Sequence, residues 1–182
     1  MSLIWRGPLA VPHFTPGRMV NGPPVAIDRI VLHSMVAWIG SADATFKSAE
    51  GDTSAHFGVR ASVDEVWQWV NVWDTAHHCE GEQGSAPYWS SMNNERSIGI
   101  EHEDEGQPFA VEGGSPVIRR NVLYKRSSLL VAQFCREYDI PCVRGAGGPG
   151  IYDHRDVSAT ACPGTLDTER IIRVAQTILA TI

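Results

Sequence analysis

Three side chains of this sequence have the chemistry to hold a metal ion together. His33 follows a short apolar run, His154 lies in an Asp-His-Arg-Asp segment, and Cys162 comes eight residues later, before Pro-Gly. Two imidazoles and one thiolate form a sound zinc ligand set, and three protein ligands leave the fourth tetrahedral position for water, as in catalytic sites. A single histidine at a strand end, or a cysteine before proline, is more often structural. The spacing alone therefore leaves both interpretations open.

The segments around these residues predict a sheet covered by helices. Apolar content and alternation predict strands over residues 26–33, 54–60, 66–72 and 97–103. Helical periodicity predicts helices over residues 41–50, within 116–138 and over 168–182. The glycine-rich residues 145–150, and those that follow to 164, are predicted as irregular loops. We therefore expect an α/β fold with a central mixed β-sheet flanked by helices.

Four of these elements carry expectations about single residues. Ser41 is the expected N-cap of the helix over 41–50, and Asp167 or Thr165 that of the last helix. Alternating isoleucines in residues 97–103 predict a strand with one buried face. On the long helix, Leu123, Leu130 and Phe134 share one face, and Arg119, Arg126 and Glu137 are expected to face water.

Composition and charge narrow the class of protein. The 182 residues suit one domain, which we place at 26–182, after a Pro/Gly-rich arm at 1–25. The formal net charge is −6 without a basic stripe, which disfavours nucleic acid as a partner. No 18-residue apolar run occurs, and prolines interrupt the first 20 residues, so neither membrane insertion nor a signal peptide is expected. We expect a monomer made in the cytoplasm, with its four cysteines reduced.

Five short segments occur in an order that resembles one known family. They are IVLHS (30–34), SAHF (54–57), DTAHH (74–78), SIGIE (97–101), and DHR (153–155) with TACPG (160–164). Together they resemble the N-acetylmuramoyl-L-alanine amidase family, which includes phage lysozyme-type endolysins and animal peptidoglycan recognition proteins. The resemblance runs from about residue 27 to residue 182.

The resemblance implies a zinc site and a reaction. It implies that His33, His154 and Cys162 bind Zn²⁺ in a groove over a mixed sheet, and that the substrate is peptidoglycan, cut between N-acetylmuramic acid and L-alanine. Glu101 matches the glutamate that some members use as general base. Its place after Ile-Gly-Ile agrees, because burial would raise its pKa into the range useful for proton transfer. The alternative for Glu101 is a solvated member of the acidic run 101–105.

Two positions depart from the pattern common in the family. Many phage members carry tyrosine where this chain has Ala55, and lysine where it has Thr160, although threonine also occurs in enzymatically active recognition proteins. These departures leave open which group stabilises the oxyanion. Thr160 and His78 are the candidates, His78 because it aligns with the histidine of the family's Ala-Trp-His-Ala-Gly segment. His56 is expected to be a structural strand histidine.

Other functions are weighed against the amidase. A cysteine hydrolase would use Cys162 as nucleophile and His154 as base, but Pro163 lacks the backbone N–H that could serve an oxyanion hole. A non-catalytic peptidoglycan-binding module is the other alternative, and members that only bind commonly lack the cysteine. A phage or prophage endolysin that reaches the cell wall after release, and a cytosolic recycling amidase, both fit a chain without a signal peptide.

Two further motifs have simpler explanations. Trp67, Trp69 and Trp73 share a parity along the strand predicted over 66–72, which allows a sugar-stacking face but is more typical of sheet packing. Residues 145–150 fit G-x-G-x-x-G, but no helix opens there and a proline interrupts the motif, so we expect a mobile loop beside the groove rather than a dinucleotide site.

Overall fold

A six-stranded mixed sheet forms the middle of the molecule. The computed structural model describes residues 11–12, 26–48, 53–61, 63–79, 92–104 and 116–181. Its strand order is β1 (Val11–Pro12), β4 (Val66–Gln68), β3 (Phe57–Val59), β5 (Ser97–His102), β2 (Arg29–Ser34) and β6 (Gly150–Asp153). Neighbouring strands pair in parallel, except that β3 and β4 are antiparallel. The predicted fold class, a mixed sheet flanked by helices, is confirmed.

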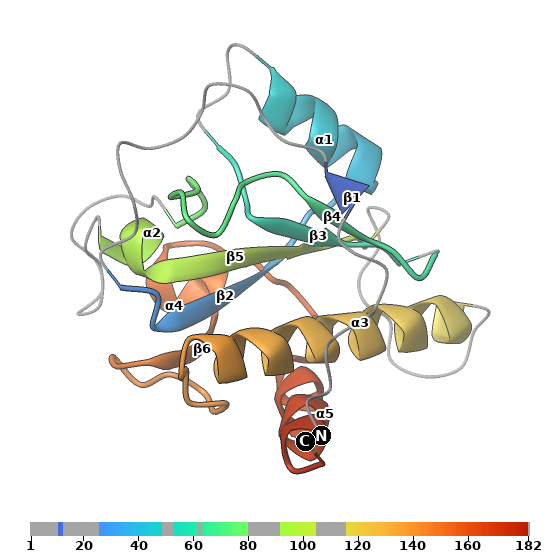
Figure 1. Cartoon of the computed structure of the whole chain (residues 1–182). Helices are drawn as coiled ribbons and strands as arrows, with labels where there is room; N and C mark the ends of the chain where they lie inside the picture. Colours follow the sequence, from blue (N-terminus) through green and yellow to red (C-terminus); the bar gives the residue numbers. More distant parts are fainter. Residues whose placement is uncertain are drawn as a thin grey trace.

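Helices cover both faces of this sheet. The long helix α3 (Pro116–Glu137) and the last helix α5 (Thr168–Leu179) lie on one side, and α1 (Ile39–Lys47) lies on the other (Figure 1). Two shorter helices, α2 (Met92–Arg96) and α4 (His154–Val157), directly precede β5 and follow β6. Among the residues that the structure describes, no helix is both long enough and apolar enough to cross a membrane.

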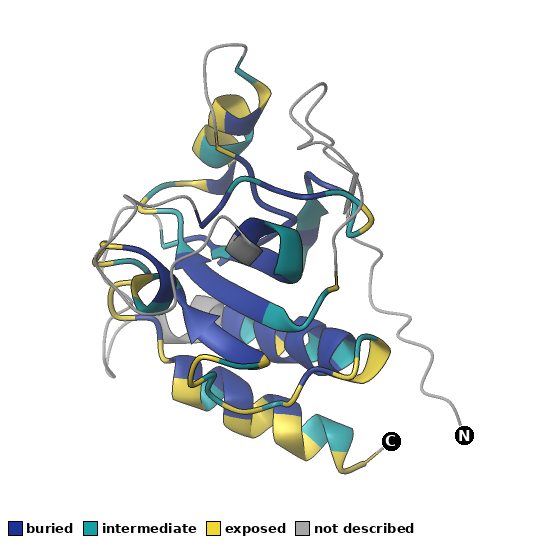
Figure 2. Cartoon of the chain, turned by 90° about the vertical axis from the view of Figure 1, so that its left-hand side faces the viewer, coloured by how far each residue is buried: buried dark blue, intermediate teal, exposed yellow. Residues whose placement is uncertain are grey.

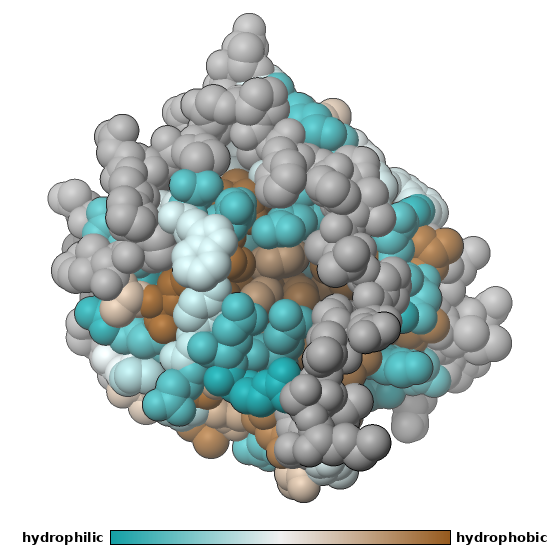
Figure 3. Space-filling view, in the orientation of Figure 1, coloured by the Kyte–Doolittle hydropathy of each residue, from teal (hydrophilic) through white to brown (hydrophobic). Residues whose placement is uncertain are grey.

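The alternation along β2 divides the interior into two layers. Ile30 and Leu32 belong to the main core, between the sheet and helices α3 and α5. Val31 points to the opposite face and packs with Tyr152 and Val157. Exposed residues gather on the outer sides of α1 and α5 (Figure 2). In the orientation of Figure 1, hydrophobic side chains occupy the centre of the visible described surface, and hydrophilic ones surround them (Figure 3). His33 has the parity of Val31, which directs it away from the main core.

Strand β5 differs from its predicted one-sided burial. Ile98 and Ile100 join the main core, as expected, but Gly99 on the other face is also buried. There the ring of His78 lies so close that a Cβ on Gly99 would be 2.6 Å from its Cγ atom. A strand in the middle of a largely parallel sheet is covered on both faces, which the alternation of its side chains did not show.

Helix α1 begins earlier than predicted because a distant residue caps it. It starts at Ile39 rather than Ser41 and ends at Lys47, and Trp38 at the N-cap position makes no side-chain capping bond. Instead, Oε1 of the buried Glu103 accepts a hydrogen bond from the Ile39 N–H at 2.9 Å. A carboxylate at a helix N-terminus satisfies a free N–H and interacts favourably with the helix dipole.

The tryptophans do not share one strand face. Strand β4 ends at Gln68, so Trp69 and Trp73 both lie beyond it. Trp69 is 1% exposed and packs on Phe46, with ring centroids 4.8 Å apart, whereas Trp73 is 65% exposed. The packing interpretation is therefore confirmed for Trp69, and the idea of a common strand face for all three is wrong.

Residues 145–164 are more ordered than the predicted irregular loop. They contain β6 and α4, and the hydroxyl of Tyr152 accepts from the Gly147 N–H at 3.0 Å and donates to the Gly148 carbonyl at 2.5 Å. The glycine-rich segment leads into the amino end of β6, whereas His154 follows the carboxyl end. The prediction of a mobile loop beside the groove therefore finds no support in this arrangement.

The two long helices agree with most of their predicted detail. Leu123, Leu130 and Phe134 are buried in the main core, and Asp167 caps α5 by accepting from the Arg170 N–H at 2.9 Å. Of the residues expected to face water, Glu137 is exposed, and the side chain of Arg119 lies outside the described residues. Arg126 is only 8% exposed and pairs with Asp64 of the β3–β4 turn, so its predicted solvent-facing position is wrong. The packing of helix on turn, which local periodicity does not report, buries it.

Of the predicted arm over residues 1–25, the structure describes Val11 and Pro12. They pair in parallel with Trp67 and Gln68 as strand β1. The boundary between arm and domain at residues 25 and 26 remains a prediction.

Candidate metal centre and active site

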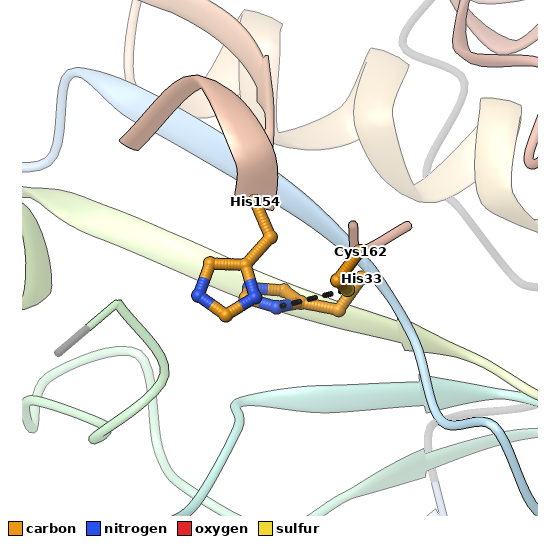
Figure 4. Close-up of side chains that lie close together, drawn as sticks. All are labelled: His33, His154 and Cys162. Carbon is orange, nitrogen blue, oxygen red and sulfur yellow. Dashed lines mark hydrogen bonds between the residues drawn. The ribbon is translucent and has the colours of Figure 1, made fainter. Parts of the chain in front are cut away.

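The three predicted metal ligands meet at the carboxyl ends of neighbouring strands. His33 lies near the end of β2, His154 opens α4 directly after β6, and Cys162 lies on the loop that follows. One candidate ligand atom from each residue lies within 4.8 Å of the others. The three side chains point toward one another, with Cys162 Sγ 4.0 Å from His33 Nδ1 (Figure 4). This is the edge at which open α/β sheets bind their ligands.

The donor set fits a zinc ion. Zinc–nitrogen bonds of about 2.1 Å and zinc–sulfur bonds of about 2.3 Å place tetrahedral ligand atoms roughly 3.4–3.6 Å apart. The observed 4.0 Å between sulfur and nitrogen needs only a small contraction. One buried polar atom beside the centre, Oε2 of Glu101, has no hydrogen-bond partner among the described residues. Buried polar atoms without a protein partner are rare and indicate a ligand or water at the site.

The protonation states of the ligands favour the same conclusion. Burial lowers the pKa of His33 well below its ordinary value and that of His154 to about 4, so both rings are neutral and keep a free lone pair. Burial raises the pKa of the Cys162 thiol to about 12. A thiol nucleophile needs a lowered pKa, which this position does not provide, whereas a metal ion displaces the thiol proton directly. These observations disfavour the cysteine hydrolase.

A network of ion pairs and one backbone hydrogen bond position the candidate ligands His154 and Cys162. Asp153 pairs with Arg144 at 3.0 Å and with Arg155 at 3.2 Å. The backbone N–H of Arg155 donates to the carbonyl of Cys162 at 2.8 Å, which ties the ligand loop to the helix that begins at His154. The two ligands nearest in sequence are therefore positioned by one local unit.

The first ligand is tied to the third through Ser34. The Ser34 backbone N–H donates to Cys162 Sγ at 3.2 Å, and the Ser34 hydroxyl donates to Asp104 at 2.5 Å. No sequence pattern indicates a role for Ser34, although it belongs to the IVLHS segment. An N–H directed at the sulfur stabilises a thiolate, which is the form that binds metal.

Glu101 lies beside this centre. It pairs in register with His33, and its Oε1 is 4.0 Å from His33 Nδ1. Its side chain is 14% exposed, and burial, with a smaller effect from the Asp104 carboxylate, raises its pKa to about 8. The expected desolvation is present, and the alternative of a solvated acidic run is wrong for this residue. Its neighbours His102 and Glu103 are also buried.

His78 lies behind His33 rather than on an open side of the centre. Its Nδ1 is 3.0 Å from His33 Nε2, and its Nε2 is 3.2 Å from the Ser97 hydroxyl. Together with Cys79, whose sulfur is 3.0 Å from His78 Nδ1, it belongs to a second buried group of possible ligand atoms that includes His33. The predicted contact of His78 with a substrate carbonyl remains untested, and both ring nitrogens face groups of the protein.

Thr160 is exposed next to the third ligand. Its Oγ1 accepts a hydrogen bond from the Cys162 N–H at 3.1 Å, which leaves the hydroxyl proton available for another acceptor. His56, by contrast, is enclosed: its Nδ1 accepts from the Gly99 N–H at 3.0 Å, and its Nε2 lies 3.1 Å from the Asp74 carbonyl. The expectation that His56 is structural agrees with these contacts.

A mixed sheet that carries two histidines, a cysteine and a buried glutamate at its strand ends defines a class of α/β proteins with a candidate metallohydrolase centre. A family model described as N-acetylmuramoyl-L-alanine amidase matches residues 22–165. The chain belongs to the N-acetylmuramoyl-L-alanine amidase family. A comparison with curated protein sequences gives no match.

Solved structures show the same fold at low sequence identity. PlyL is similar with a TM-score of 0.62 and 16% identity, over 91% of this chain and 96% of that chain. A mutant endolysin from Bacillus subtilis gives 0.63 and 20%, over 91% and 97%. A selenomethionine derivative of AmpD gives 0.64 and 17%, over 91% and 93%. At these identities the likeness establishes the fold.

Proposed function

We propose that this protein is a zinc-dependent amidase that hydrolyses the bond between the lactyl group of N-acetylmuramic acid and the first L-alanine of the peptidoglycan stem peptide. The observation that carries the proposal is the convergence of His33, His154 and Cys162 within 4.8 Å in a chain of the amidase family. When bound by these residues, zinc supplies a Lewis acid that lowers the pKa of a water toward about 7 and polarises an amide carbonyl.

Glu101 is the general base and acid of the reaction. Its carboxylate takes a proton from the attacking water and delivers it to the leaving alanine nitrogen, so that the products are a muramic acid carboxylate and a peptide amine. Its Oε1, 4.0 Å from His33 Nδ1, lies within one water of the centre, and its pKa of about 8 is close to working pH. A carboxyl with a pKa near the working pH both accepts and returns a proton readily.

Thr160 is the donor to the developing oxyanion. Its hydroxyl already accepts from the Cys162 N–H, so its own proton is free to point toward a substrate atom on the exposed side. Where the family commonly has a charged lysine, a neutral hydroxyl gives a weaker interaction with the oxyanion. This weaker donor leaves a larger share of charge stabilisation to the metal.

The expected partner is peptidoglycan or its soluble fragments, and the protein is expected to act as a monomer. Endolysins are among the solved structures with this fold, which supports action on the cell wall after release, as in phage or prophage lysis. Recycling of soluble muropeptides in the cytosol is the alternative. Comparing rates on intact sacculi with rates on soluble muropeptides separates the two.

Mass spectrometry of digested peptidoglycan tests the reaction. Free peptides that begin with L-alanine, together with intact glycan, are expected; cleaved sugars or internally cut peptides would contradict the proposal. Cys162→Ala should lose zinc and activity together. Cys142→Ala, at a partly buried cysteine that contacts the Ile172 carbonyl, is the matched control and should keep both. A chelator should abolish turnover and added zinc restore it, whereas a thiol enzyme would survive the chelator.

A further inference from the structure

The two nitrogens of the His33 ring have different surroundings. Nδ1 faces the candidate metal centre, 4.0 Å from both Cys162 Sγ and Glu101 Oε1. Nε2 faces the interior, 3.0 Å from Nδ1 of His78. A neutral imidazole carries one proton, so the nitrogen that donates a hydrogen bond leaves the other with a free lone pair. The contact at Nε2 therefore decides whether Nδ1 can bind a metal.

The surroundings of His78 determine the direction of that contact. Its Nε2 is 3.2 Å from the Ser97 hydroxyl. On the same side, the ring also makes a hydrogen bond to the Ser97 backbone carbonyl. A carbonyl only accepts hydrogen bonds, so the ring nitrogen on the Ser97 side carries the proton. His78 Nδ1 is then an acceptor, which both His33 Nε2 and the Cys79 sulfur contact at 3.0 Å. An unprotonated His33 Nε2 would set two lone pairs against each other, so this nitrogen carries its proton toward His78.

We propose that His78, oriented by Ser97, is a positioning residue that holds His33 in its Nε2–H tautomer and so directs the Nδ1 lone pair at the metal centre. The inference rests on the proposed metal-binding function and gives His78 a role other than contact with substrate. Metal-binding histidines typically donate their second nitrogen to an oriented acceptor, which fixes tautomer and ring orientation. Here a second imidazole is that acceptor.

Three packing features hold the His78 ring in place. Gly99 offers no Cβ, and the ring lies against its Cα, where any side chain would collide with Cγ at 2.6 Å. Asn94 Oδ1 accepts from the backbone N–H groups of His78 and Cys79 at 3.0 and 2.8 Å. The ring is buried, so water does not compete for its Nδ1. The acceptor is thus fixed before any metal binds.

Zinc affinity measures the strength of this positioning. Losing a partner that orients a metal ligand typically weakens metal binding by about 10–100-fold. His78→Phe keeps a ring of similar size but removes the acceptor, so its zinc dissociation constant should rise by about 10–100-fold. His78→Asn places Oδ1 near the position of Nδ1 and should restore most of the affinity. His77→Phe, the same change at the adjacent histidine, is the control and should bind zinc as tightly as the wild type.

The affinities are measured by competition with a chromophoric chelator, and circular dichroism confirms that each variant is folded. Equal zinc affinity in His78→Phe and wild type, or an equally large loss in His78→Asn and His78→Phe, would overturn the inference. If the wild type bound no zinc at all, the proposed metal centre itself would be wrong, and the tautomer would still be testable.

Nitrogen-15 NMR of the metal-free protein supplies that second measurement, and it needs no variant to fold. The chemical shifts of the His33 ring should show a protonated Nε2 and an unprotonated Nδ1 in the wild type. In folded His78→Phe, the two tautomers should become mixed. A protonated Nδ1 in the wild type would refute the proposed direction of the hydrogen bond, whatever the enzyme's activity.

Discussion

Replacing Glu101 with glutamine should stabilise the metal-free protein at neutral to alkaline pH and slow turnover in the zinc-loaded enzyme. The folded protein raises the pKa of this carboxyl from 4.5 to about 8. The protein therefore binds a proton more tightly when folded than when unfolded. Stability from this group is fully present below pH 4.5 and is lost as the pH rises toward 8. Glutamine, which does not titrate, should not show this loss.

The size of the effect follows from the two pKa values. At about 1.4 kcal/mol per pH unit, the difference between about 8 and 4.5 corresponds to about 5 kcal/mol above pH 8, and to about 3 kcal/mol at pH 7. The amide of glutamine brings a buried N–H₂ group to a position where Oε2 has no partner, which costs roughly 1–3 kcal/mol at every pH. The test therefore measures the free energy of unfolding of the variant minus that of the wild type, and asks how this difference changes with pH.

Urea unfolding of chelator-treated protein provides the assay. Trp69 is fully buried and reports unfolding through its fluorescence. The stability of Glu101→Gln minus that of the wild type should rise by several kcal/mol between pH 4 and pH 8. Glu137→Gln, at an exposed position near the end of α3, is the control and should show no such rise. A flat difference for Glu101→Gln would mean that the carboxyl is not desolvated. In the zinc-loaded enzyme, the same variant should retain metal and lose about 10²–10⁴-fold in turnover.

Three other variants test the site and its supports. Gly99→Ala should push the His78 ring aside, lowering stability by about 1–3 kcal/mol in urea unfolding and weakening zinc binding; unchanged affinity would contradict the close packing. Glu103→Gln replaces one of the two carboxylate oxygens that accept from the Ile39 and Ala61 N–H groups, 2.9 and 2.7 Å away. It should lower the free energy of unfolding by about 1–3 kcal/mol, and α1 should lose amide-exchange protection first. Thr160→Val should lower kcat by roughly 10²-fold with zinc retained, Thr160→Ser should recover most of it, and equal rates would remove Thr160 from the reaction.

The stability predictions share one physical theme. A buried carboxylate that must accept a proton during turnover costs folding free energy, because burial disfavours its charged form. The same desolvation brings its pKa close to working pH, which favours proton transfer. Glu103 is more deeply buried, but both of its oxygens accept backbone N–H groups, so it stabilises the loop and helix it joins. Two carboxylates two residues apart therefore have opposite effects on stability.

The sequence by itself determined much of this protein. Runs of apolar residues located β2 and β5, and the capped, periodic last segment located α5, because these signals depend on neighbours within a turn or a strand. The residue types of His33, His154 and Cys162 identified a possible metal set, and the order of the short segments indicated the family. The place of Glu101 after Ile-Gly-Ile predicted its desolvation, although the alternation did not show that its face of β5 is covered.

Only the tertiary structure decided which residues, distant in sequence, are in contact. Cys162 and His33 are 129 residues apart in sequence but 4.0 Å apart in space, and pairing of β2 with β6 accounts for their approach. The N-cap of α1 is supplied by Glu103, and the acceptor for His33 is His78, each from another part of the chain. Such partners leave no periodic signal, because contacts across a sheet depend on strand order and register. The sequence therefore names the chemical groups, and the packing of the sheet decides which of them act together.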